Sequence, residues 1–372
     1  MKALFLLFHG FEAHNGISKK IFSQIKAIKE CGVNIESCYF DVDEKGFRRW
    51  MIGNNEIANF GNSFISKIKK RIIFEPIIKY VKDNDISFIY IRYNHNANPF
   101  TIRFVKQLNK LGIKTVLEIP TYPYDKEYIN LRMKCRLFID KCFRVKLAQY
   151  INSIITFSNH DTIFNQKTIR ISNGIDFSAI QVKSHINNTS KQLNLIGVAE
   201  IHYWHGFDRV INGLAEYYKS NPKYMVFFHI IGDFSGDREK NEILNPILKN
   251  KLEKYIIIHG SQHGSKLDEL FELADIGIGS LARHRCGISN IKTLKNREYA
   301  ARGIPFIYSE NDSDFDKMPY VLKVSADDSP INIESIIDFY RVNKYSPVQI
   351  RESINDLSWE KQMKNVIDNI II

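Results

Sequence analysis

Short apolar runs alternate with helical patterns along the first half of the chain. Apolar residues that recur every three or four positions predict helices at Ser18–Cys31, Phe100–Leu111 and Leu131–Ala148. The apolar runs are rich in Ile, Phe, Val and Tyr and are too short for helices, so they predict buried strands. These strands are expected at Ala3–Phe8, Asn34–Phe40, Phe88–Arg92, Lys114–Glu118 and Ser153–Thr156. The first half therefore has the β-α-β order of a parallel sheet covered by helices.

The second half of the chain begins this alternation again. Its strands are expected at Leu193–Val198, Met225–Ile231, Tyr255–His259, Ile276–Leu281 and Phe306–Tyr308. Its helices are expected at Phe207–Tyr218, Asn241–Asn250, Leu267–Leu273 and Leu294–Ala301. Two successive series of this kind predict an α/β protein with two Rossmann-like, doubly wound parallel sheets that face each other across a cleft.

A polar segment at 181–191 separates the two series and is expected to be the linker. The predicted domains are therefore 1–180 and 192–357. Residues 358–372 have the pattern of a last amphipathic helix, which we expect to pack back on the N-terminal domain. Open α/β sheets bind ligands at the carboxyl ends of their strands, so the active site is expected in the cleft between the domains.

The composition is that of an ordinary globular protein, with 44% hydrophobic and 25% charged residues. No run reaches the roughly 20 apolar residues that span a bilayer. Leu4–Phe8 is too short for the core of a secretion signal. Five scattered cysteines without C-x-x-C spacing predict neither a disulfide framework nor a zinc site. We therefore expect a cytoplasmic protein that holds no metal.

The net charge of +11 lies in the first half of the chain, because residues 181–372 are close to neutral. Such asymmetry indicates an anionic partner for that half. The segments 64–74 and 132–150 interleave basic and apolar residues. Each fits either a basic amphipathic helix on an anionic membrane surface or a domain helix with its basic face in water. No nucleic-acid-binding signature accompanies the charge, so nucleic acid is not an expected partner.

Polar side chains follow two predicted strands of the first half. Asn94 and His95 come after the third strand, and His95 fits either a structural role or one in orienting a sugar or moving a proton. Glu118 ends the fourth strand, and Tyr122 and Tyr124 follow it. A carboxylate beside aromatic rings suits a carbohydrate, whose faces are apolar and whose edges are polar. The sequence therefore predicts a saccharide site here.

Glycines and cations mark the helix starts and strand ends on the nucleotide side. Gly16 lies in the loop that leads into the first helix, which fits either an ordinary βα turn or an anion site where the backbone approaches closely and the helix dipole favours negative charge. His205 and Arg209 flank the start of the helix that follows the strand Leu193–Val198. Gly232 and Gly260 close two further strands, where backbone groups can hold a base.

The segment 290–305 is the most informative part of the sequence. It links two predicted strands and carries Lys292, Lys295 and Arg297 at the start of a helix, beside the carboxylate of Glu298. Cations and free N–H groups at a helix start suit phosphate. A carboxylate one turn further in suits a sugar diol, so the segment predicts a site for a nucleoside diphosphate.

Taken together, these motifs resemble the retaining glycosyltransferases of the GT-B fold known as family 4. The family's second domain opens with Gly and then a KG-hydrophobic-Asp sequence, matched by Gly197 and by His205-Gly206-Phe207-Asp208. An NGID sequence at the domain junction is present at 173–176. The late signature of a glutamate before A-x-G-x-P is matched by Glu298 and the residues 301–305. The resemblance covers nearly the whole chain.

The resemblance implies roles for individual residues. Glu298 would bind the ribose, the amides near Leu294 and the side chain of Lys295 would bind the diphosphate, and Gly260 would frame the base. The full set of implied donor contacts is Gly16, His205, Arg209, Gly232, Gly260, Asn290, Lys292, Leu294, Lys295 and Glu298. Tyr122, Tyr124 and Asn94 are expected to bind the acceptor. No metal or cofactor is implied, because basic side chains and a helix dipole stabilise the leaving diphosphate.

The chain departs from the family pattern at three positions. Asn290 replaces the first glutamate of the late pair, Ala199 and His205 replace the usual Arg and Lys, and Pro120 replaces a histidine. Glu118 or His95 would then take over the contacts of that histidine, which makes them the catalytic candidates.

The expected function is transfer of a sugar from a nucleoside-diphosphate sugar to a saccharide or polyprenyl-diphosphate-linked acceptor, with retention of configuration. Cell-surface polysaccharide synthesis, such as that of capsule or O-antigen, at the inner face of the membrane would fit the basic first half. Two alternatives stay open at this point. One is a GT-B sugar-nucleotide epimerase, and the other is a non-catalytic scaffold that binds a nucleotide sugar or a membrane.

Overall fold

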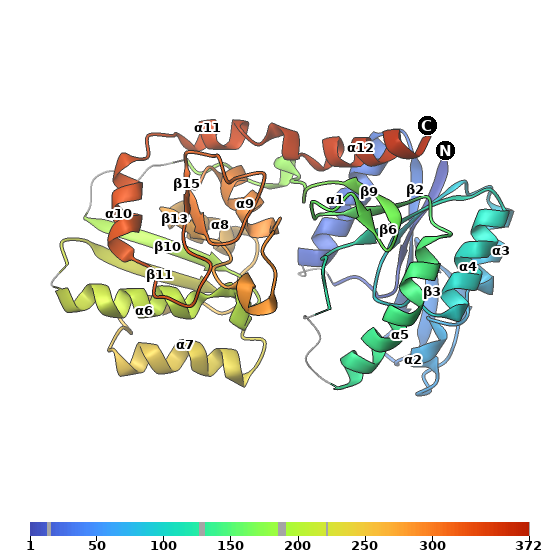
Figure 1. Cartoon of the computed structure of the whole chain (residues 1–372), viewed down its shortest axis with the longest axis horizontal. Coiled ribbons are helices and arrows are strands. Elements are labelled where there is room, and N and C mark those ends of the chain that lie inside the picture. Colours follow the sequence, from blue (N-terminus) through green and yellow to red (C-terminus); the bar gives the residue numbers. More distant parts are fainter. Residues whose placement is uncertain (13–15, 126–130, 185–190, 221, 372) are drawn as a thin grey trace. The chain divides into compact units, whose positions relative to one another are not determined.

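The computed structural model describes residues 1–12, 16–125, 131–184, 191–220 and 222–371. The chain forms two compact units (Figure 1). Unit 1 comprises Met1–Ser172 together with Trp359–Ile372, and unit 2 comprises Asn173–Ser358. Each unit is an α/β structure built on its own sheet.

The chain enters unit 2 after Ser172, ahead of the polar segment 181–191. The amide of Ile175 donates to the carbonyl of Leu357 at 2.7 Å. Arg351 donates to the carbonyls of Phe177 and Ile180. Residues 173–180 belong to unit 2 because these bonds tie them to its last helical segment.

Unit 1 contains a nine-stranded sheet in the order β4-β3-β2-β1-β5-β6-β7-β9-β8. Its strands are β1 (Lys2–Leu7), β2 (Asn34–Val42), β3 (Arg48–Ile52), β4 (Asn55–Asn59), β5 (Phe88–Arg92), β6 (Lys114–Ile119), β7 (Ser153–Thr156), β8 (Thr162–Ile163) and β9 (Gln166–Arg170). The six central strands, β2, β1, β5, β6, β7 and β9, are parallel to one another. Antiparallel strands extend both edges, β3 and β4 beside β2 and β8 beside β9.

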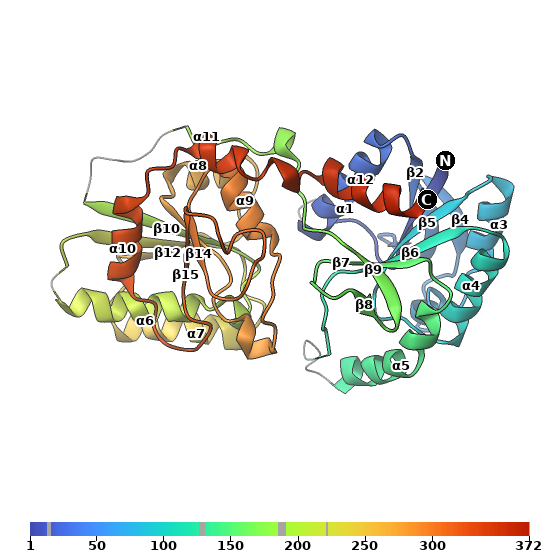
Figure 2. The same ribbon diagram turned by 45° about the horizontal axis from the view of Figure 1, so that its top comes forward.

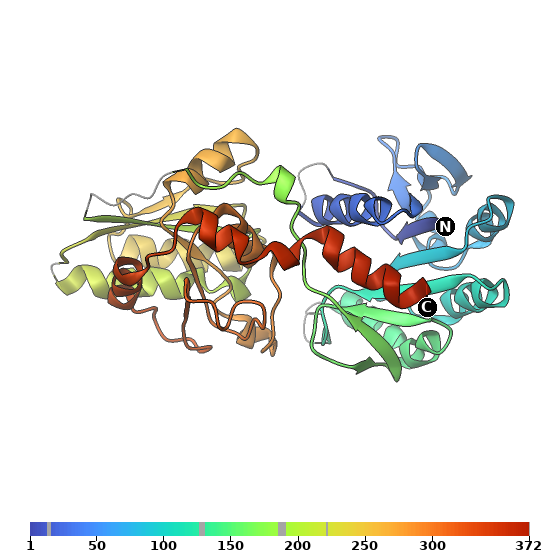
Figure 3. The same cartoon turned by 90° about the horizontal axis from the view of Figure 1, so that it is seen from above.

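Helices cover both faces of this sheet. They are α1 (Gly16–Glu30), α2 (Ser66–Lys69), α3 (Glu75–Asp83), α4 (Pro99–Lys110), α5 (Leu131–Ala148) and α12 (Trp359–Ile371). Side chains of β1 point alternately to the two faces of the sheet, as the geometry of a strand requires. Phe5 and Leu7 belong to the core shared with α1 and α12, which pack side by side (Figure 3). Leu4 and Leu6 belong to the core shared with α3, α4 and α5.

Unit 2 contains a six-stranded, fully parallel sheet in the order β12-β11-β10-β13-β14-β15. Its strands are β10 (Gln192–Val198), β11 (Met225–Ile231), β12 (Ile256–Ile258), β13 (Ile276–Ile278), β14 (Phe306–Tyr308) and β15 (Val321–Lys323). Its helices are α6 (Phe207–Tyr217), α7 (Asp237–Lys249), α8 (Ser265–Leu273), α9 (Leu294–Arg302), α10 (Ile333–Val342) and α11 (Pro347–Glu352). Side chains of α6, α7 and α10 share one core, and those of α8, α9 and α11 share the other (Figure 2).

The predicted doubly wound fold is confirmed, and each predicted strand and helix is present with its ends shifted by at most a few residues. Several elements were not predicted. These are the strands β3, β4, β8, β9 and β15 and the helices α3, α10 and α11, while the helix expected within 64–74 is the short α2.

Helix α12 contributes the buried side chain of Met363 to the core of unit 1. Met363 has no exposed surface and packs with side chains of α1 and β1. Met363→Ala should lower the free energy of unfolding by about 2–5 kcal/mol, because it leaves a cavity in a closed core. Chemical denaturation measures this loss. Glu360→Ala, an exposed change on the same helix, should stay within about 0.5 kcal/mol of the wild type. Equal effects of the two changes would contradict this packing role.

Candidate functional site

The loops after β10 and β13 come together at the carboxyl edge of the sheet in unit 2. Gly206 has a φ of +69°, and a Cβ atom there would lie 2.8 Å from the Cβ of Leu281. The amide of Leu281 donates to the carbonyl of His205 at 3.0 Å. Glycine is needed at this position because both the left-handed backbone and the close approach exclude a side chain. His205 is thereby held next to the segment that carries Arg283.

Lys295 lies in the first turn of α9, and its ammonium group is buried without a counter-ion in the part of the chain that the structure describes. The Nζ atom has no solvent-exposed surface and no hydrogen-bond partner among the described residues. It lies 5.4 Å from the centre of the Phe207 ring, a cation–π contact. Burial and then the positive charge of Arg283 lower the pKa of Lys295 to about 7. The neutral amine form of Lys295 is thus poised to gain a proton when an anion binds beside it.

His205 adds a neutral hydrogen-bond donor to this cluster. Burial, followed by the charges of Lys295 and Arg283, lowers its pKa well below the ordinary range, so the ring is uncharged. Its Nδ1 atom accepts a hydrogen bond from the amide of His202 at 3.2 Å. The single ring proton therefore sits on Nε2, which is a donor.

Other buried polar atoms near these strand ends also lack hydrogen-bond partners within the described part of the chain. They are Ser280 Oγ after β13, Thr293 Oγ1 at the start of α9 and Asn296 Oδ1 in its first turn. Buried polar groups are rarely left unpaired in folded proteins unless a ligand or water completes them. The hydroxyls of Ser280 and Thr293 can each donate a hydrogen bond to a ligand oxygen, whereas the Asn296 oxygen can only accept one.

The remaining predicted cations of this region are neutralised by carboxylates. Arg297 is fully buried and donates to both oxygens of Asp312 and to Asp314. Lys292 Nζ lies 3.6 Å from Asp314. Arg209 donates to the carbonyls of Leu281 and Ser329 and to Asp327 at 3.2 Å.

Arg209 and Lys292 remain predicted donor contacts, and in this structure their charges already pair with carboxylates of unit 2. The cluster described above comprises Lys295, Arg283 and His205 near the start of α9 at Leu294.

Glu298 follows Lys295 on the same side of α9, since residues three apart are neighbours on a helix. Its Oε1 atom accepts from Arg302 at 3.1 and 3.2 Å, and its side chain remains partly exposed. Asn290 is exposed and bridges to Asn311 at the edge of the same region.

Two glycines draw further strand ends toward the site. The amide of Gly232, after β11, donates to the carbonyl of Gly260, after β12, at 2.8 Å. A Cβ atom on Gly232 would lie 1.7 Å from the carbonyl oxygen of Ala199. A side chain at Gly232 would therefore push the loop after β10 away from its neighbours.

Glu118 in unit 1 is a buried structural ion pair. Arg92, Tyr90 and Gln24 donate to its carboxylate, and Lys20 Nζ lies 3.7 Å away. Burial alone would raise its pKa, but Lys20 and Arg92 outweigh this effect and lower it. The carboxylate has no exposed surface, so this geometry favours a role in joining α1, β5 and β6 over contact with a sugar.

His95 and Tyr124 are also largely enclosed. Their ring centres lie 4.2 Å apart, and the Tyr124 hydroxyl donates to the buried Asp140 at 2.7 Å. Burial and the charge of Arg136 lower the pKa of His95 to about 3, so the ring is neutral near pH 7. Asn94 accepts from Arg136 through its carbonyl and its side chain.

Two predicted residues of unit 1 keep open surroundings. Tyr122 is partly exposed and contacts the rings of His160 and Phe164 edge-on. Gly16 opens α1, and a Cβ atom there would meet nothing within 4 Å. Of the predicted acceptor contacts, Tyr122 is thus the one with ring surface available to a sugar.

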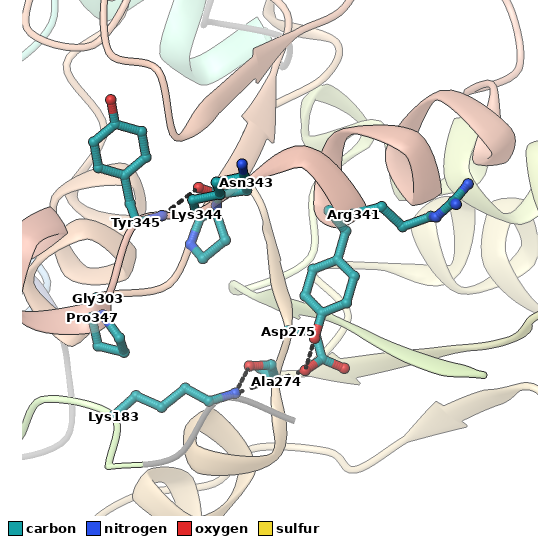
Figure 4. Close-up of a pocket in the computed structure, with 11 residues that line it drawn as sticks. Lys183, Ala274, Asp275, Gly303, Arg341, Asn343, Lys344, Tyr345 and Pro347 are labelled. Atoms are coloured by element: carbon teal, nitrogen blue, oxygen red, sulfur yellow. Dashed lines mark hydrogen bonds and ion pairs between the residues drawn. The ribbon is translucent and has the colours of Figure 1, made fainter. Parts of the chain in front are cut away.

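A separate pocket of about 300 Å³ lies at the other end of α9 (Figure 4). Lys183 reaches into it, donates to the carbonyl of Ala274 and lies 3.9 Å from Asp275. The Tyr340 hydroxyl donates to the same carboxylate at 3.4 Å. These polar groups of the pocket are thus paired with one another. We interpret these contacts as the attachment of residues 181–184 to unit 2.

Arg283 was missed by the sequence analysis. It is the first residue of the run Arg283-His284-Arg285, which follows the buried segment ending at Leu281. Cations placed directly after a strand of a parallel sheet lie at its ligand-binding edge. This placement was the available signal. The neighbouring Arg285 is instead paired with Asp208 and Asp328.

No protein-family model and no curated protein matches the sequence. Solved structures match across almost the whole chain. Sucrose-phosphate synthase from Thermosynechococcus elongatus has a TM-score of 0.68 at 12% identity, over 99% of this chain and 98% of that one. Anabaena HepE in complex with UDP has a TM-score of 0.66 at 14% identity, over 100% of both chains. WaaG, a glycosyltransferase of lipopolysaccharide biosynthesis, has a TM-score of 0.61 at 12% identity, over 99% of both chains. The chain therefore has the GT-B fold of these glycosyltransferases.

Proposed function

We propose that this chain is a glycosyltransferase that takes a sugar from a nucleoside diphosphate and passes it to a saccharide acceptor with retention of configuration. The observation that carries the proposal is the buried ammonium group of Lys295, which lies at the start of α9 and has no hydrogen-bond partner within the described ranges of the chain. The charge of Arg283 contributes to the lowered pKa of Lys295, and the charges of both contribute to the lowered pKa of His205. The three side chains therefore lie within electrostatic reach of one another.

A buried cation without a counter-ion costs stability, so its retention in a folded protein points to a ligand that supplies the negative charge. The N-terminus of a nine-residue helix adds free N–H groups and the positive end of a dipole. A diphosphate matches this set, since its oxygens accept several charge-assisted hydrogen bonds.

The same groups would act in the chemical step. Breaking the bond between the sugar and the diphosphate leaves negative charge on the leaving oxygen. Lys295, Arg283 and the start of α9 would stabilise that charge as it develops, which lowers the barrier without involvement of a metal. Transfer with retention would then require the acceptor hydroxyl to attack the face from which the diphosphate departs.

The proposed arrangement of the donor follows the fold of unit 2. Glu298 would bind the ribose diol, and backbone groups near Gly232 and Gly260 would hold the base. HepE was solved with UDP and with UDP-glucose, which supports a nucleotide-sugar donor for a chain of this fold. The proposed acceptor is a saccharide carried on a polyprenyl diphosphate, in the synthesis of a cell-surface polysaccharide.

The geometry of unit 1 disfavours the epimerase alternative. Epimerisation requires groups that give and take protons, whereas Glu118 is locked in a buried ion pair and His95 is a neutral, enclosed ring. Product analysis with a nucleotide-sugar panel separates the candidates. Turnover that depends on an acceptor supports transfer, a changed sugar nucleotide without acceptor supports epimerisation, and binding without turnover supports the scaffold.

Removal of the Lys295 ammonium should stabilise the free protein. The pKa of Lys295 is lowered on folding from 10.5 to about 7, so the charged form is penalised in the folded state. The penalty is complete below pH 7 and disappears as pH rises toward 10.5, where the unfolded chain also loses the proton. Lys295→Met should therefore raise Tm at pH 7, and this gain should shrink toward pH 10.

Arg297→Met on the same helix is the matched contrast. It leaves Asp312 buried without its partner and should cost about 3–5 kcal/mol. Thermal melting at several pH values measures both variants. A destabilised Lys295→Met protein would show that Lys295 has a structural partner and would remove the basis of the proposal.

Lys295→Met should also weaken the binding of both UDP and pyrophosphate by about 10- to 100-fold, because each loses a charge-assisted hydrogen bond. Glu298→Ala should weaken UDP alone, since pyrophosphate has no ribose. Calorimetric titration measures the affinities. Lys266→Met, in the exposed first turn of α8, is the control and should bind both ligands like the wild type. Unchanged pyrophosphate binding by Lys295→Met would contradict the assignment of the diphosphate site.

Diphosphate binding should take up a proton. At pH 8.5 the Lys295 side chain of the free protein is mostly a neutral amine, and an adjacent diphosphate favours its protonated form. UDP binding at pH 8.5 should therefore take up as much as about one proton, and its affinity should fall as pH rises above 7. Titration in two buffers of different ionisation enthalpy detects the uptake. The Lys295→Met variant should show none, and equal uptake by the variant would assign the proton to another group.

A further inference from the structure

Helix α5 of unit 1 has an apolar stripe on its exposed side. Leu131, Cys135, Phe138, Cys142 and Val145 are spaced by four and three residues in turn, which places them along one line of a helix. Leu131 is 79% exposed and Phe138 is 69% exposed, and both cysteines are exposed. A helix on the surface of a globular protein normally carries polar residues on this side.

The opposite side of α5 accounts for its packing in the unit. Leu137, Leu147 and Ala148 are buried there in the core shared with α3 and α4. In Figure 2, α5 runs along the lower edge of its unit. The exposed stripe is therefore additional to the face that the fold requires.

The exposed charged side chains of α5 itself are of one sign. Lys134 and Lys146 are exposed, and they flank the stripe on opposite sides of the helix. Lys141 is also exposed and is paired with Asp125 at 2.9 Å. The single acidic residue of α5, Asp140, is buried and accepts from Tyr93 and Tyr124. No acidic side chain of α5 thus interrupts the exposed surface.

A second exposed apolar group lies in the segment that leads into α2. Phe64 is 73% exposed, and Ile65 and Ile68 are exposed as well. The ammonium of Lys67, itself exposed, lies 5.4 Å from the centre of the Phe64 ring. Arg136 of α5 is among the charges that, after burial, lower the pKa of Lys70 at the end of α2 to about 8. The two basic segments therefore lie within electrostatic reach of each other.

We infer that the apolar stripe of α5, with the exposed lysines beside it, forms a docking face for an anionic phospholipid surface. Aromatic and aliphatic side chains would enter the boundary between headgroups and acyl chains, while the lysines beside them pair with lipid phosphates. Charge complementarity favours this occupant over a protein, because the exposed cations flank the apolar line on both sides. Large exposed apolar side chains in a cationic setting are a recognised mark of membrane contact.

One nearby cation is excluded from this face because it is bonded inside unit 1. Lys70 is half-buried and donates to the carbonyl of Phe8 at 2.8 Å, so it does not belong to the docking face. Among the described residues, no helix combines the length and apolar content needed to cross a bilayer. The inferred contact is therefore peripheral. It does not depend on the proposed transferase activity, since neither Lys295 nor Glu298 takes part in it.

Vesicle sedimentation tests the inference. The wild-type chain should pellet with vesicles that contain phosphatidylglycerol, should pellet at least ten-fold less with pure phosphatidylcholine, and should be released by high salt. Phe138→Glu should reduce partitioning on phosphatidylglycerol at least ten-fold, and Lys134→Glu about five-fold. Leu248→Glu is the matched control, because Leu248 is a 62% exposed apolar residue of α7 in unit 2. It should pellet like the wild type.

Failure of the wild type to pellet, or equal pelleting by Phe138→Glu, would overturn the inference. The vesicles contain no saccharide, so acceptor binding does not contribute. UDP binding by Phe138→Glu should remain at the wild-type level, which distinguishes a failure of this inference from a failure of the proposed transferase activity.

The cysteines of the stripe give a second readout. Cys135 and Cys142 are the exposed cysteines of the chain, while Cys38 and Cys286 are buried and Cys31 is partly so. An environment-sensitive fluorophore on Cys135 of a Cys142→Ser variant should shift to the blue when phosphatidylglycerol vesicles are added. A blue shift that instead follows protein concentration without vesicles, together with a dimer in sedimentation velocity, would overturn the inference in favour of a second copy of the chain.

Discussion

The buried ion pair between Arg297 and Asp312 is the interaction on which the donor side of the molecule depends. It fixes the first turn of α9 against the loop that follows β14, and Asp314 completes it. Because Arg297 points into this loop, Lys295 lies on a different side of the helix, where no carboxylate of the described residues reaches it. Two cations two positions apart therefore have opposite roles. One is fully paired and sets the geometry, and the other is left unpaired by that geometry.

Glycines impose a second constraint on the same region. Gly206 lets the loop after β10 press against Leu281, and Gly232 lets the end of β11 approach Ala199. Side chains at these positions would separate loops whose contact brings His205 toward Arg283. The cluster around Lys295 is thus a consequence of backbone packing at three strand ends. Its charges are concentrated by the fold, against their mutual repulsion, rather than by any attraction among themselves.

The sequence predicted the two sheets because their strands are buried on both faces and read as continuous apolar runs. It did not predict the edge hairpin β3-β4, whose strands have weak alternation, although Gly53-Asn54 between them is a recognised turn pair. The site was harder to predict than the fold. Sequence shows where cations lie, whereas their availability depends on distant partners, as with Arg209 and Asp327 or Lys292 and Asp314. The burial of Glu118 could not be predicted for the same reason, because its partners Lys20 and Arg92 come from other elements.

Lys295 and Phe138 have one property in common, because each is placed where it destabilises the isolated fold. A charge buried without a partner and an aromatic ring left in water are both unfavourable for the isolated fold. Folding alone does not explain either one, since methionine at the first position and a polar residue at the second would suit the free protein better. A second surface of matching chemistry would offset the cost in each case, and the proposed surfaces are a diphosphate for Lys295 and an anionic lipid layer for Phe138. The two proposals thus assign different anions to the two units, because a buried ammonium suits a small, highly charged group and an exposed apolar stripe suits a lipid layer.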